Sequence, residues 1–347
     1  MGYKKIKVVM TICAVLAVGI SNTNCKDDNP PDNDINVQTQ ESIESASDLT
    51  ICSFNIQFLG HFKKKDNKSL ANLLKDYDIV VIQELVAPPK SGQYPNGDFY
   101  SADDEAKAFF DEMESQGFSY QLSEEDTGTN DEIHSKTSST EWWVSFFKSE
   151  KIELANDLPF GFLDDDRSNN DDFERVPYAF AYRTVDSSTD FVLISVHLQP
   201  GSSSNNKARR KHEIRTISNW IDSHDDVEKD FIILGDMNIE DSLELADVTP
   251  VGYLSLNDEC VITNTLLRND GTGGKPYDHV MFNLTHTTEI NQSFDFDVVD
   301  LVKEMESHWS STDPYPGNPY NHNLFRQYYS DHHPVVFKLN VSQSDDD

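Results

Sequence analysis

Short apolar runs recur along the chain and stop abruptly at polar residues. Four of these runs are 49–54 before Asn55, 79–82 before Gln83 and Glu84, 191–196 before His197, and 231–235 before Asp236 and Asn238. The runs are rich in β-branched residues and are bounded by turn formers, so they predict buried strands rather than helices. In each predicted strand the polar group lies at the C-terminal end.

Two further segments show the reverse order. Asp278 precedes the run 279–282, and Asp331 with His332 precedes the run 334–337. A strand that begins with its polar residue reaches the same edge as strands that end with theirs, provided that it runs antiparallel to them. We therefore expect polar residues from six segments to meet at one edge of a mixed sheet, since rigid scaffolds commonly carry function there.

Residues 49–341 predict a single domain. The chain has 347 residues, and no internal repeat or long linker divides this stretch. The candidate edge residues come from both of its ends, which argues against two domains. Cys52 and Cys260 lie within it, and the sequence leaves open whether they are two buried thiols or a disulfide.

The N-terminal residues predict export from the cell. Lys4, Lys5 and Lys7 precede an apolar run at 8–20, which is too short to span a bilayer comfortably. This pattern is typical of a secretory signal covering residues 1–25, and an N-terminal membrane anchor is the alternative.

Cys25 is followed by the run Lys-Asp-Asp at 26–28. This resembles the lipoprotein signal of Bacteroidetes-type bacteria, which implies an outer-membrane lipid anchor at Cys25 and a location on the cell surface or outside the cell. The polar residues 26–48 predict a disordered tether, and 342–347 predict an unstructured acidic tail.

The net charge of −33 restricts the way in which a phosphate-bearing substrate can be bound. Proteins that bind polyanions over a broad surface are basic, so this chain would need a local positive feature or a bound cation. Two basic clusters follow predicted edge residues, at 63–65 with Lys68 and at 207–211 with Arg215. We expect at least one of them to face phosphate; solvated surface is the alternative.

Hard oxygen donors dominate the predicted edge. Glu84, Asp236 and Asp331 offer carboxylates, and Asn55 and Asn238 offer amides. No cluster of cysteine and histidine accompanies them, so a bound metal would be Mg²⁺, Mn²⁺ or Ca²⁺ rather than zinc.

Two histidines complete the candidate chemistry. His197 and His332 can each donate to a phosphate oxygen or shuttle a proton if a carboxylate holds the ring. Glu141 and Asp278 are the available carboxylate partners.

Together these segments resemble the endonuclease/exonuclease/phosphatase superfamily, in that superfamily's order and from about residue 49 to 340. Arg175, within Glu174-Arg175-Val176-Pro177, looks like the phosphate-facing arginine of its Arg-x-Pro motif. The other segments that carry the resemblance are Phe54-Asn55, Ile82-Gln83-Glu84, Ser195-Val196-His197-Leu198, Leu234-Gly235-Asp236-Met237-Asn238, Tyr277-Asp278-His279-Val280 and Ser330-Asp331-His332-His333-Pro334.

The resemblance implies a four-layered α/β/β/α sandwich of two mixed sheets flanked by helices. It also implies divalent-metal-dependent hydrolysis of a phosphoester by direct attack of water. The implied roles are metal binding by Glu84 with Asn55 and Asp331, activation of water by Asp236, phosphate binding by Asn238 and Arg175, and phosphate binding by two histidines, His197 held by Glu141 and His332 held by Asp278.

Two substrate classes fit the resemblance. The segment Tyr277-Asp278-His279 looks like the DNase-I-like branch, so the leading hypothesis is a secreted or surface-tethered endonuclease acting on DNA or RNA. The alternative is a phosphodiesterase or phosphatase of lipid headgroups or small phosphoesters, similar to a sphingomyelinase or an inositol phosphatase. The negative net charge favours this alternative, as does Ser139, which stands where the branch carries a DNA-stacking tyrosine. The filled catalytic positions disfavour a third hypothesis, a non-catalytic binding module. The sequence gives no indication of a protein partner.

Overall fold

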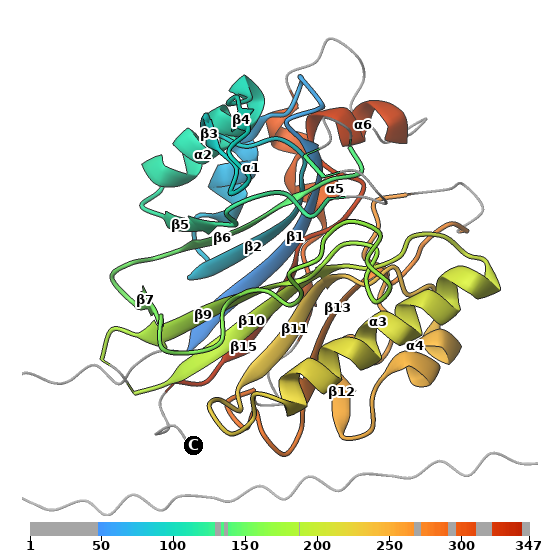
Figure 1. Cartoon of the computed structure of the whole chain (residues 1–347). Helices are drawn as coiled ribbons and strands as arrows, with labels where there is room; N and C mark the ends of the chain where they lie inside the picture. The colour runs from blue at the N-terminus through green and yellow to red at the C-terminus, as the bar shows by residue number, and fades with distance from the viewer. Residues whose placement is uncertain are drawn as a thin grey trace, which may run out of the picture. The chain divides into compact units, whose positions relative to one another are not determined.

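The apolar runs of the sequence form two β-sheets that pack face to face (Figure 1). The computed structural model describes residues 48–128, 133–134, 138–186, 188–266, 272–290, 296–309 and 321–341. All of these residues belong to one compact unit. The expected signal at 1–25, the tether at 26–48 except Asp48, and the tail at 342–347 lie outside the described residues.

Each sheet is mixed. The first has six strands, in the order β14 (Asp297–Val298), β15 (Val335–Leu339), β1 (Leu49–Leu59), β2 (Ile79–Leu85), β6 (Trp142–Phe147) and β5 (Ser119–Leu122). The second has seven strands: β12 (Tyr253–Ser255), β13 (Asp278–Asn283), β11 (Phe231–Asp236), β10 (Asp190–His197), β9 (Tyr178–Thr184) and β7 (Ile152–Leu154) in order, with β8 (Gly161–Phe162) also paired to β9. A separate hairpin joins β3 (Gly92–Gln93) to β4 (Phe99–Tyr100).

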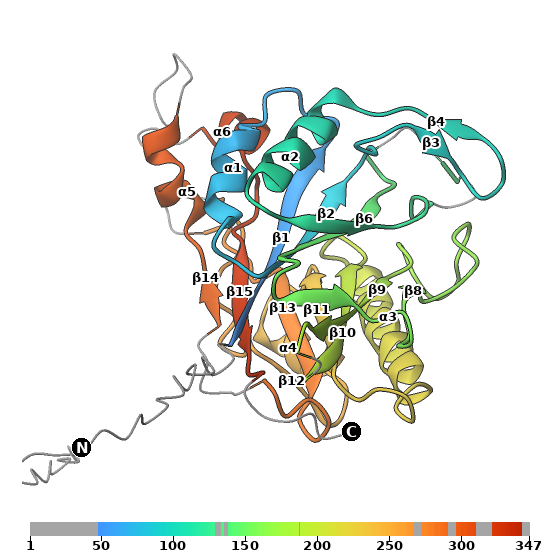
Figure 2. The same cartoon turned by 90° about the vertical axis from the view of Figure 1, so that its left-hand side faces the viewer.

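Helices cover the outer face of each sheet (Figures 1 and 2). The first sheet carries α1 (Asn67–Leu74), α2 (Asp104–Ser115), α5 (Leu301–Glu304), α6 (His322–Tyr328) and the 3₁₀ turn Glu306–His308; the second carries α3 (Ser204–Asp222) and α4 (Ser242–Val248). None of the helices in the described part of the chain is long and apolar enough to span a bilayer.

Three hydrophobic clusters separate the layers. One lies between the first sheet and its helices, one between the second sheet and α3 and α4, and one between the two sheets. Cys52 is buried in the first of these clusters and Cys260 packs at the edge of the second, and both are free thiols. The predicted four-layered α/β/β/α sandwich is confirmed.

Strand direction explains why the polar residues share an edge. The central pairs β1–β2 and β10–β11 are parallel, so their C-terminal ends lie at the same side of the two sheets. The strands β13 and β15 run antiparallel to their neighbours β11 and β1, and Asp278 therefore lies opposite Asp236. The expected antiparallel course of the two strands with reversed order is confirmed.

Side-chain alternation turns the inner face from apolar to polar toward this edge. Residues two apart on a strand face the same side, so Ile51 in the core between the sheets leads to Ser53 and then to Asn55. Gln83 joins Ser53 to Ser195 of the other sheet by hydrogen bonds of 3.3 to 3.4 Å. The site thus begins where the core between the sheets ends.

Strand β11 requires a glycine directly before Asp236. Gly235 has φ +140°, and a Cβ added there would lie 2.1 Å from the carbonyl oxygen of Val196 in β10. We expect Gly235→Ala to force β10 and β11 apart and to lower the free energy of unfolding by about 3 kcal/mol, measured by urea denaturation.

Gly161→Ala is the matched control. Gly161 also has a positive φ, +104°, but nothing lies within 4 Å of an added Cβ. Only the backbone strain remains there, so a loss of about 1 kcal/mol is expected. Equal losses in the two variants would contradict the importance of the contact with Val196.

Candidate active site

A backbone bulge in β2 turns Glu84 toward Asn55, and a second irregularity follows Asn55 in β1. Strand β1 continues past Asn55 with a shift of register against β2, and β2 shifts against β6 between Ile82 and Leu85. Glu84 has φ +62°, a left-handed conformation that is strained for a residue with a side chain and that re-aims this side chain. Its carboxylate accepts hydrogen bonds from Asn55 Nδ2 at 2.9 Å and from the Phe58 N–H at 3.1 Å.

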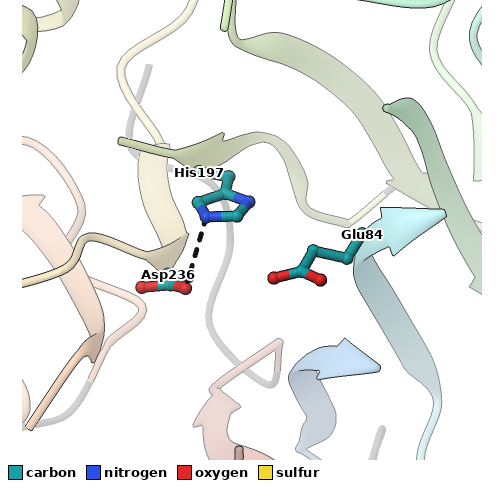
Figure 3. Close-up of side chains that lie close together, drawn as sticks. All are labelled: Glu84, His197 and Asp236. Atoms are coloured by element: carbon teal, nitrogen blue, oxygen red, sulfur yellow. Dashed lines mark ion pairs between the residues drawn. The ribbon is translucent and has the colours of Figure 1, made fainter. Parts of the chain in front are cut away.

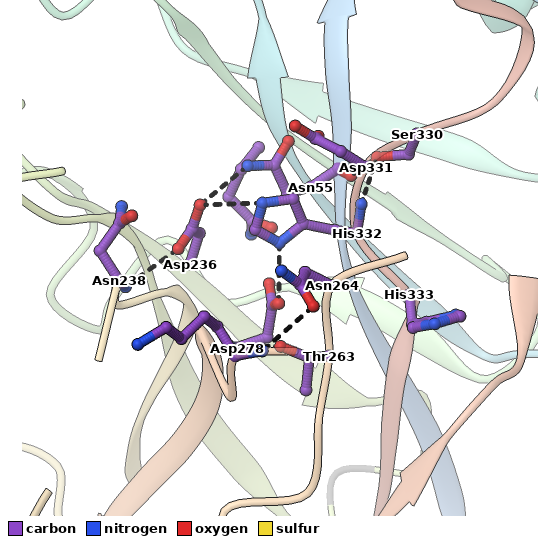
Figure 4. Close-up of polar contacts among 12 residues, drawn as sticks. Asn55, Asp236, Asn238, Thr263, Asn264, Asp278, Ser330, Asp331, His332 and His333 are labelled. Carbon is purple, nitrogen blue, oxygen red and sulfur yellow. Dashed lines mark hydrogen bonds and ion pairs between the residues drawn. The ribbon is translucent and has the colours of Figure 1, made fainter. Parts of the chain in front are cut away.

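Asp236 occupies the centre of the site. Its Oδ2 lies 3.5 Å from His197 Nε2 and 3.4 Å from His332 Nε2, and it accepts a hydrogen bond from Asn55 Nδ2 at 3.0 Å. Figure 3 shows Asp236 beside His197 with Glu84 pointing toward them, and Figure 4 shows Asp236 joined by dashed lines to Asn55 and His332. Both imidazoles therefore face one carboxylate oxygen.

A second carboxylate holds each imidazole from behind. His197 Nδ1 lies 2.7 Å from Glu141 Oε1, and His332 Nδ1 lies 2.8 Å from Asp278 Oδ2. All four side chains are buried. A carboxylate on Nδ1 fixes the ring and directs Nε2 forward, here toward Asp236. These are the pairs that the family resemblance implied.

Glu141 also binds Arg175. The Arg175 Nε lies 2.7 Å from Glu141 Oε1, the same oxygen that faces His197. Burial alone would raise the pKa of Glu141, but His197 and Arg175 outweigh burial and lower this pKa to about 2. Burial and Arg175 act to lower the pKa of His197, yet Glu141 and Asp236 outweigh them and raise it.

In the other pair the histidine pKa is also raised, but the pKa of the carboxylate shifts in the opposite direction from that of Glu141. Burial would lower the pKa of His332, but Asp278 and Asp236 hold it well above its ordinary value. Burial raises the pKa of Asp278 despite the attraction of His332. A raised imidazole pKa means that His332 carries its proton at neutral pH and can donate from Nε2.

Asp331 and Asn238 lie at the margin of this centre. Asp331 accepts a hydrogen bond from Gln57 Nε2, and its Oδ2 lies 3.8 Å from Arg326 Nη1. The Asn238 N–H donates to Asp236 Oδ1 at 2.9 Å, while its Nδ2 donates to the Leu198 carbonyl at 3.1 Å. The metal role of Asp331 and the phosphate role of Asn238 stay predictions.

Sequence reasoning missed two supporting residues. Gln57, with φ +54°, holds Asp331, and Ser330 donates from Oγ to the Asn55 carbonyl at 2.6 Å and accepts from the His332 N–H at 3.0 Å. Ser330 stands within a motif quoted from the sequence, so its position was a usable signal. Regular alternation places Gln57 on the same face as Asn55, so its position was a usable signal as well.

The acidic residues fit a bound divalent cation. Glu84, His197 and Asp236 offer ligand atoms that lie within 4.8 Å of one another. Burial raises the pKa of Glu84 to about 7 even though His197 acts to lower it. An ionised Glu84 therefore lacks sufficient positive charge nearby, which a cation would supply, and carboxylate oxygens suit Mg²⁺, Mn²⁺ or Ca²⁺.

Many of the basic residues expected near phosphate are paired with acids. The ion pairs are Lys207–Glu244, Arg210–Glu244, Lys211–Asp247 and Lys63–Asp103. Lys65 is buried and donates to the carbonyls of Ile56 and Tyr329, and burial lowers its pKa to about 7. The positive charge directly at the centre comes instead from Arg175 and the imidazoles.

Comparisons with known proteins agree on the fold. No family model matches the sequence, and no curated protein sequence matches it. A Bacteroides thetaiotaomicron endonuclease/exonuclease/phosphatase family protein is similar in structure, with a TM-score of 0.52 and 14% identity, over 84% of this chain and 97% of that one.

Two other solved structures are similar over most of their length. A mannosyl-6-phosphatase from Bacteroides thetaiotaomicron has a TM-score of 0.53 and 15% identity, over 84% of this chain and 99% of that one. Truncated TDP2 from Caenorhabditis elegans has a TM-score of 0.51 and 11% identity, over 84% of this chain and 97% of that one. At these identities the likeness establishes the fold alone: this chain has the four-layered sandwich that these solved structures share.

Proposed function

We propose that this chain is a divalent-metal-dependent phosphoester hydrolase that works by direct attack of water on phosphorus. One observation carries the proposal: two imidazoles, each held by a buried carboxylate, converge on Asp236 beside the strained and buried Glu84. The fold and the order of the motifs support the same reaction class.

The residues of the centre have different roles in the proposed hydrolysis. Asp236 orients the attacking water and accepts its proton, while protonated His332 and His197 donate from Nε2 to phosphate oxygens. A divalent cation held by Glu84, with Asn55 and Asp331 as the resemblance implies, would polarise the phosphoester as a Lewis acid. The water oxygen bonds to phosphorus, the ester P–O bond breaks, and the alcohol leaves with a proton.

The test is a substrate panel with metal titration. The purified chain is assayed with Mg²⁺, Mn²⁺ or Ca²⁺ on plasmid DNA, RNA, sugar phosphates, phospholipid headgroups and a chromogenic phosphodiester. Hydrolysis of at least one of these that stops on addition of EDTA is the expected result. No hydrolysis with any metal would overturn the proposal, as would activity that persists in EDTA.

The surroundings of the centre favour a small phosphoester. A hollow of about 510 Å³ adjoins the same edge, next to Trp142, which follows Glu141, and Val86, which follows the end of β2. Among the described residues that line it there is no lysine or arginine. Its aromatic and acidic lining residues are His61, Tyr94, Phe99, Tyr100, His134, Trp142, Asp98, Asp103 and Asp126. Such a lining repels further phosphates and suits an organic group attached to one phosphate.

Nucleic acid is the second candidate substrate, supported by the similarity of Tyr277-Asp278-His279 to the DNase-I-like branch. Lys207→Ala combined with Lys211→Ala separates the two candidates. Both lysines are ion-paired with acids. We therefore expect the KM for small phosphoesters, and the dependence of this KM on salt concentration, to be unchanged in the variant. A KM for DNA that rises in this variant, with a shallower salt dependence, would favour the endonuclease.

We also propose that the chain is exported and tethered by lipid at Cys25. The support is the basic and apolar N-terminal run followed by Cys25 and acidic residues. We expect the full chain to sediment with membranes, and Cys25→Ser to move it to the soluble fraction, as detected by immunoblotting. Sedimentation of both proteins alike would contradict lipidation.

A further inference from the structure

A buried carboxylate on α3 lies outside the catalytic centre but bonds to two segments that lead into it. The Glu213 side chain is fully buried. Its Oε1 accepts a hydrogen bond from the Glu174 N–H at 2.8 Å, and its Oε2 accepts one from the Gln199 N–H at 2.9 Å. One side chain therefore connects two segments that are far apart in sequence.

The two segments carry the residues that meet at Glu141. Glu174 directly precedes Arg175, and Gln199 comes two residues after His197. Arg175 Nε and His197 Nδ1 each lie 2.7 Å from Glu141 Oε1. Because backbone N–H groups beside both residues bond to one carboxylate, their spacing at Glu141 depends on α3.

A neighbouring residue of α3 strengthens this support. Arg210 lies three residues before Glu213, on the same face of the helix, and is also fully buried. Its Nη1 donates to the carbonyls of Gln199 and Gly201, both at 2.8 Å. Helix α3 thus holds both the N–H and the carbonyl of Gln199.

The burial of Glu213 is expected to lower the stability of the fold, which a purely structural contact would not require. Among the described residues, no lysine, arginine or histidine forms an ion pair with it, and burial raises its pKa to about 7. Burying an ionised carboxylate without a paired cation lowers stability. A buried group that lowers stability is expected where function requires it.

We propose that Glu213 is a positioning residue of the hydrolytic site, which sets the placement of Arg175 and His197 against Glu141 through the backbone of Glu174 and Gln199. The inference rests on the proposed hydrolase function. Glu213 does not touch the reacting atoms and acts only through these two residues.

The test compares Glu213→Gln with Glu228→Gln in the full chain. A glutamine keeps the shape of Glu213 but can accept only one of the two hydrogen bonds without presenting a donor to the other N–H. We expect kcat to fall about tenfold to a hundredfold while KM changes less than about threefold, because small displacements of catalytic groups have effects of this size. Glu228 is a matched control, since it is buried and accepts from the Lys229 and Asp230 N–H groups before β11, at the strand end remote from Asp236.

A double-mutant cycle separates positioning from general stability. In a His197→Ala background, Glu213→Gln should cause much less than its full loss of kcat, because part of its action passes through His197. A full additional loss would overturn the proposal, as would an unchanged kcat in Glu213→Gln alone. If Glu213→Gln does not fold, Glu213→Asp, which keeps the charge on a shorter arm, takes its place in the same cycle.

An activity-independent measurement keeps this inference distinct from the proposed function. The pKa of His197, followed by NMR, should fall in Glu213→Gln and stay unchanged in Glu228→Gln, since a displaced His197 loses its contact with Glu141. If the wild-type chain hydrolyses no phosphoester, the proposed function fails while this titration still tests Glu213. An unchanged His197 pKa in Glu213→Gln would overturn the positioning role.

Discussion

Replacing Asp236 by asparagine is expected to lower kcat by at least about 10³-fold, because in the proposed mechanism this carboxylate accepts the proton of the attacking water and faces both imidazoles. Its Oδ2 faces the Nε2 atoms of both His197 and His332 and accepts from Asn55 Nδ2, while its Oδ1 accepts from the Asn238 N–H. Asparagine has nearly the same shape but cannot accept a proton from water. It would also place an amide donor against one of the groups that now donate to Asp236.

Asp190→Asn is the control for this change. Asp190 begins β10, at the end of the sheet remote from His197, and pairs with Arg183. We expect this variant to keep its kcat, and both variants to retain the circular dichroism of the wild type. A kcat within tenfold of wild type in Asp236→Asn would refute the assignment of Asp236 to water activation.

Glu84→Gln is expected to abolish metal binding together with activity. In the wild type, saturating Mg²⁺ or Mn²⁺ should raise the melting temperature, since a ligand present at about 100 times its Kd stabilises the fold by about 2.7 kcal/mol. In Glu84→Gln that rise should disappear and kcat/KM should fall by at least about 10³-fold. Glu153→Gln, at an exposed position of β7, should keep both properties.

The pH dependence of Glu84 follows from its raised pKa. Burial raises this pKa from 4.5 to about 7, so the folded metal-free protein binds a proton that the unfolded chain releases between these values. The free energy of unfolding should therefore fall as pH rises from about 4.5 to 7, by up to about 3 kcal/mol from this group, and be unaffected by it outside that window. Urea denaturation in EDTA should show a smaller fall in Glu84→Gln.

The same titration should weaken metal binding in acid. A proton and a cation compete for the carboxylate, so the affinity should fall about tenfold for each pH unit below about 7. A metal affinity that is constant between about pH 5 and pH 8 would contradict the role of Glu84 as the principal ligand.

The predicted edge of polar residues could be derived from sequence because its causes are local. A strand alternates its faces with a period of two, so the runs before Asn55 and His197 indicate which way these residues point. Each parallel pair of strands places its C-terminal ends on one side, and the reversed order at Asp278 and Asp331 identifies the antiparallel neighbours.

The backbone bulges could not be derived in this way. Regular alternation would place Glu84 with Val80 and Ile82 on the helix-covered face of β2, and only its φ of +62° turns it toward Asn55. A left-handed residue with a side chain is held by the contacts around it, and these contacts come from other strands.

The partners of the charged residues also depended on the tertiary structure. In sequence, the segment 207–211 is a basic cluster, but Arg210 is buried against Glu244 and Lys211 pairs with Asp247. Glu213 lies in the same helix and gives no sign in sequence that it bonds to Glu174 and Gln199. The partner of a charged side chain is the group that lies next to it in the folded protein. Local sequence composition does not specify this neighbour.

The sequence by itself determined which residues this protein brings to the common edge of its two sheets, because strand period and direction are short-range properties. The tertiary structure alone decided how these residues meet. Asn55 and Asp236, which hydrogen-bond at 3.0 Å, are 181 positions apart along the chain. The convergence of His197 and His332 on one oxygen of Asp236 likewise arises only when the two sheets pack together, since no local pattern specifies a distance between segments so far apart.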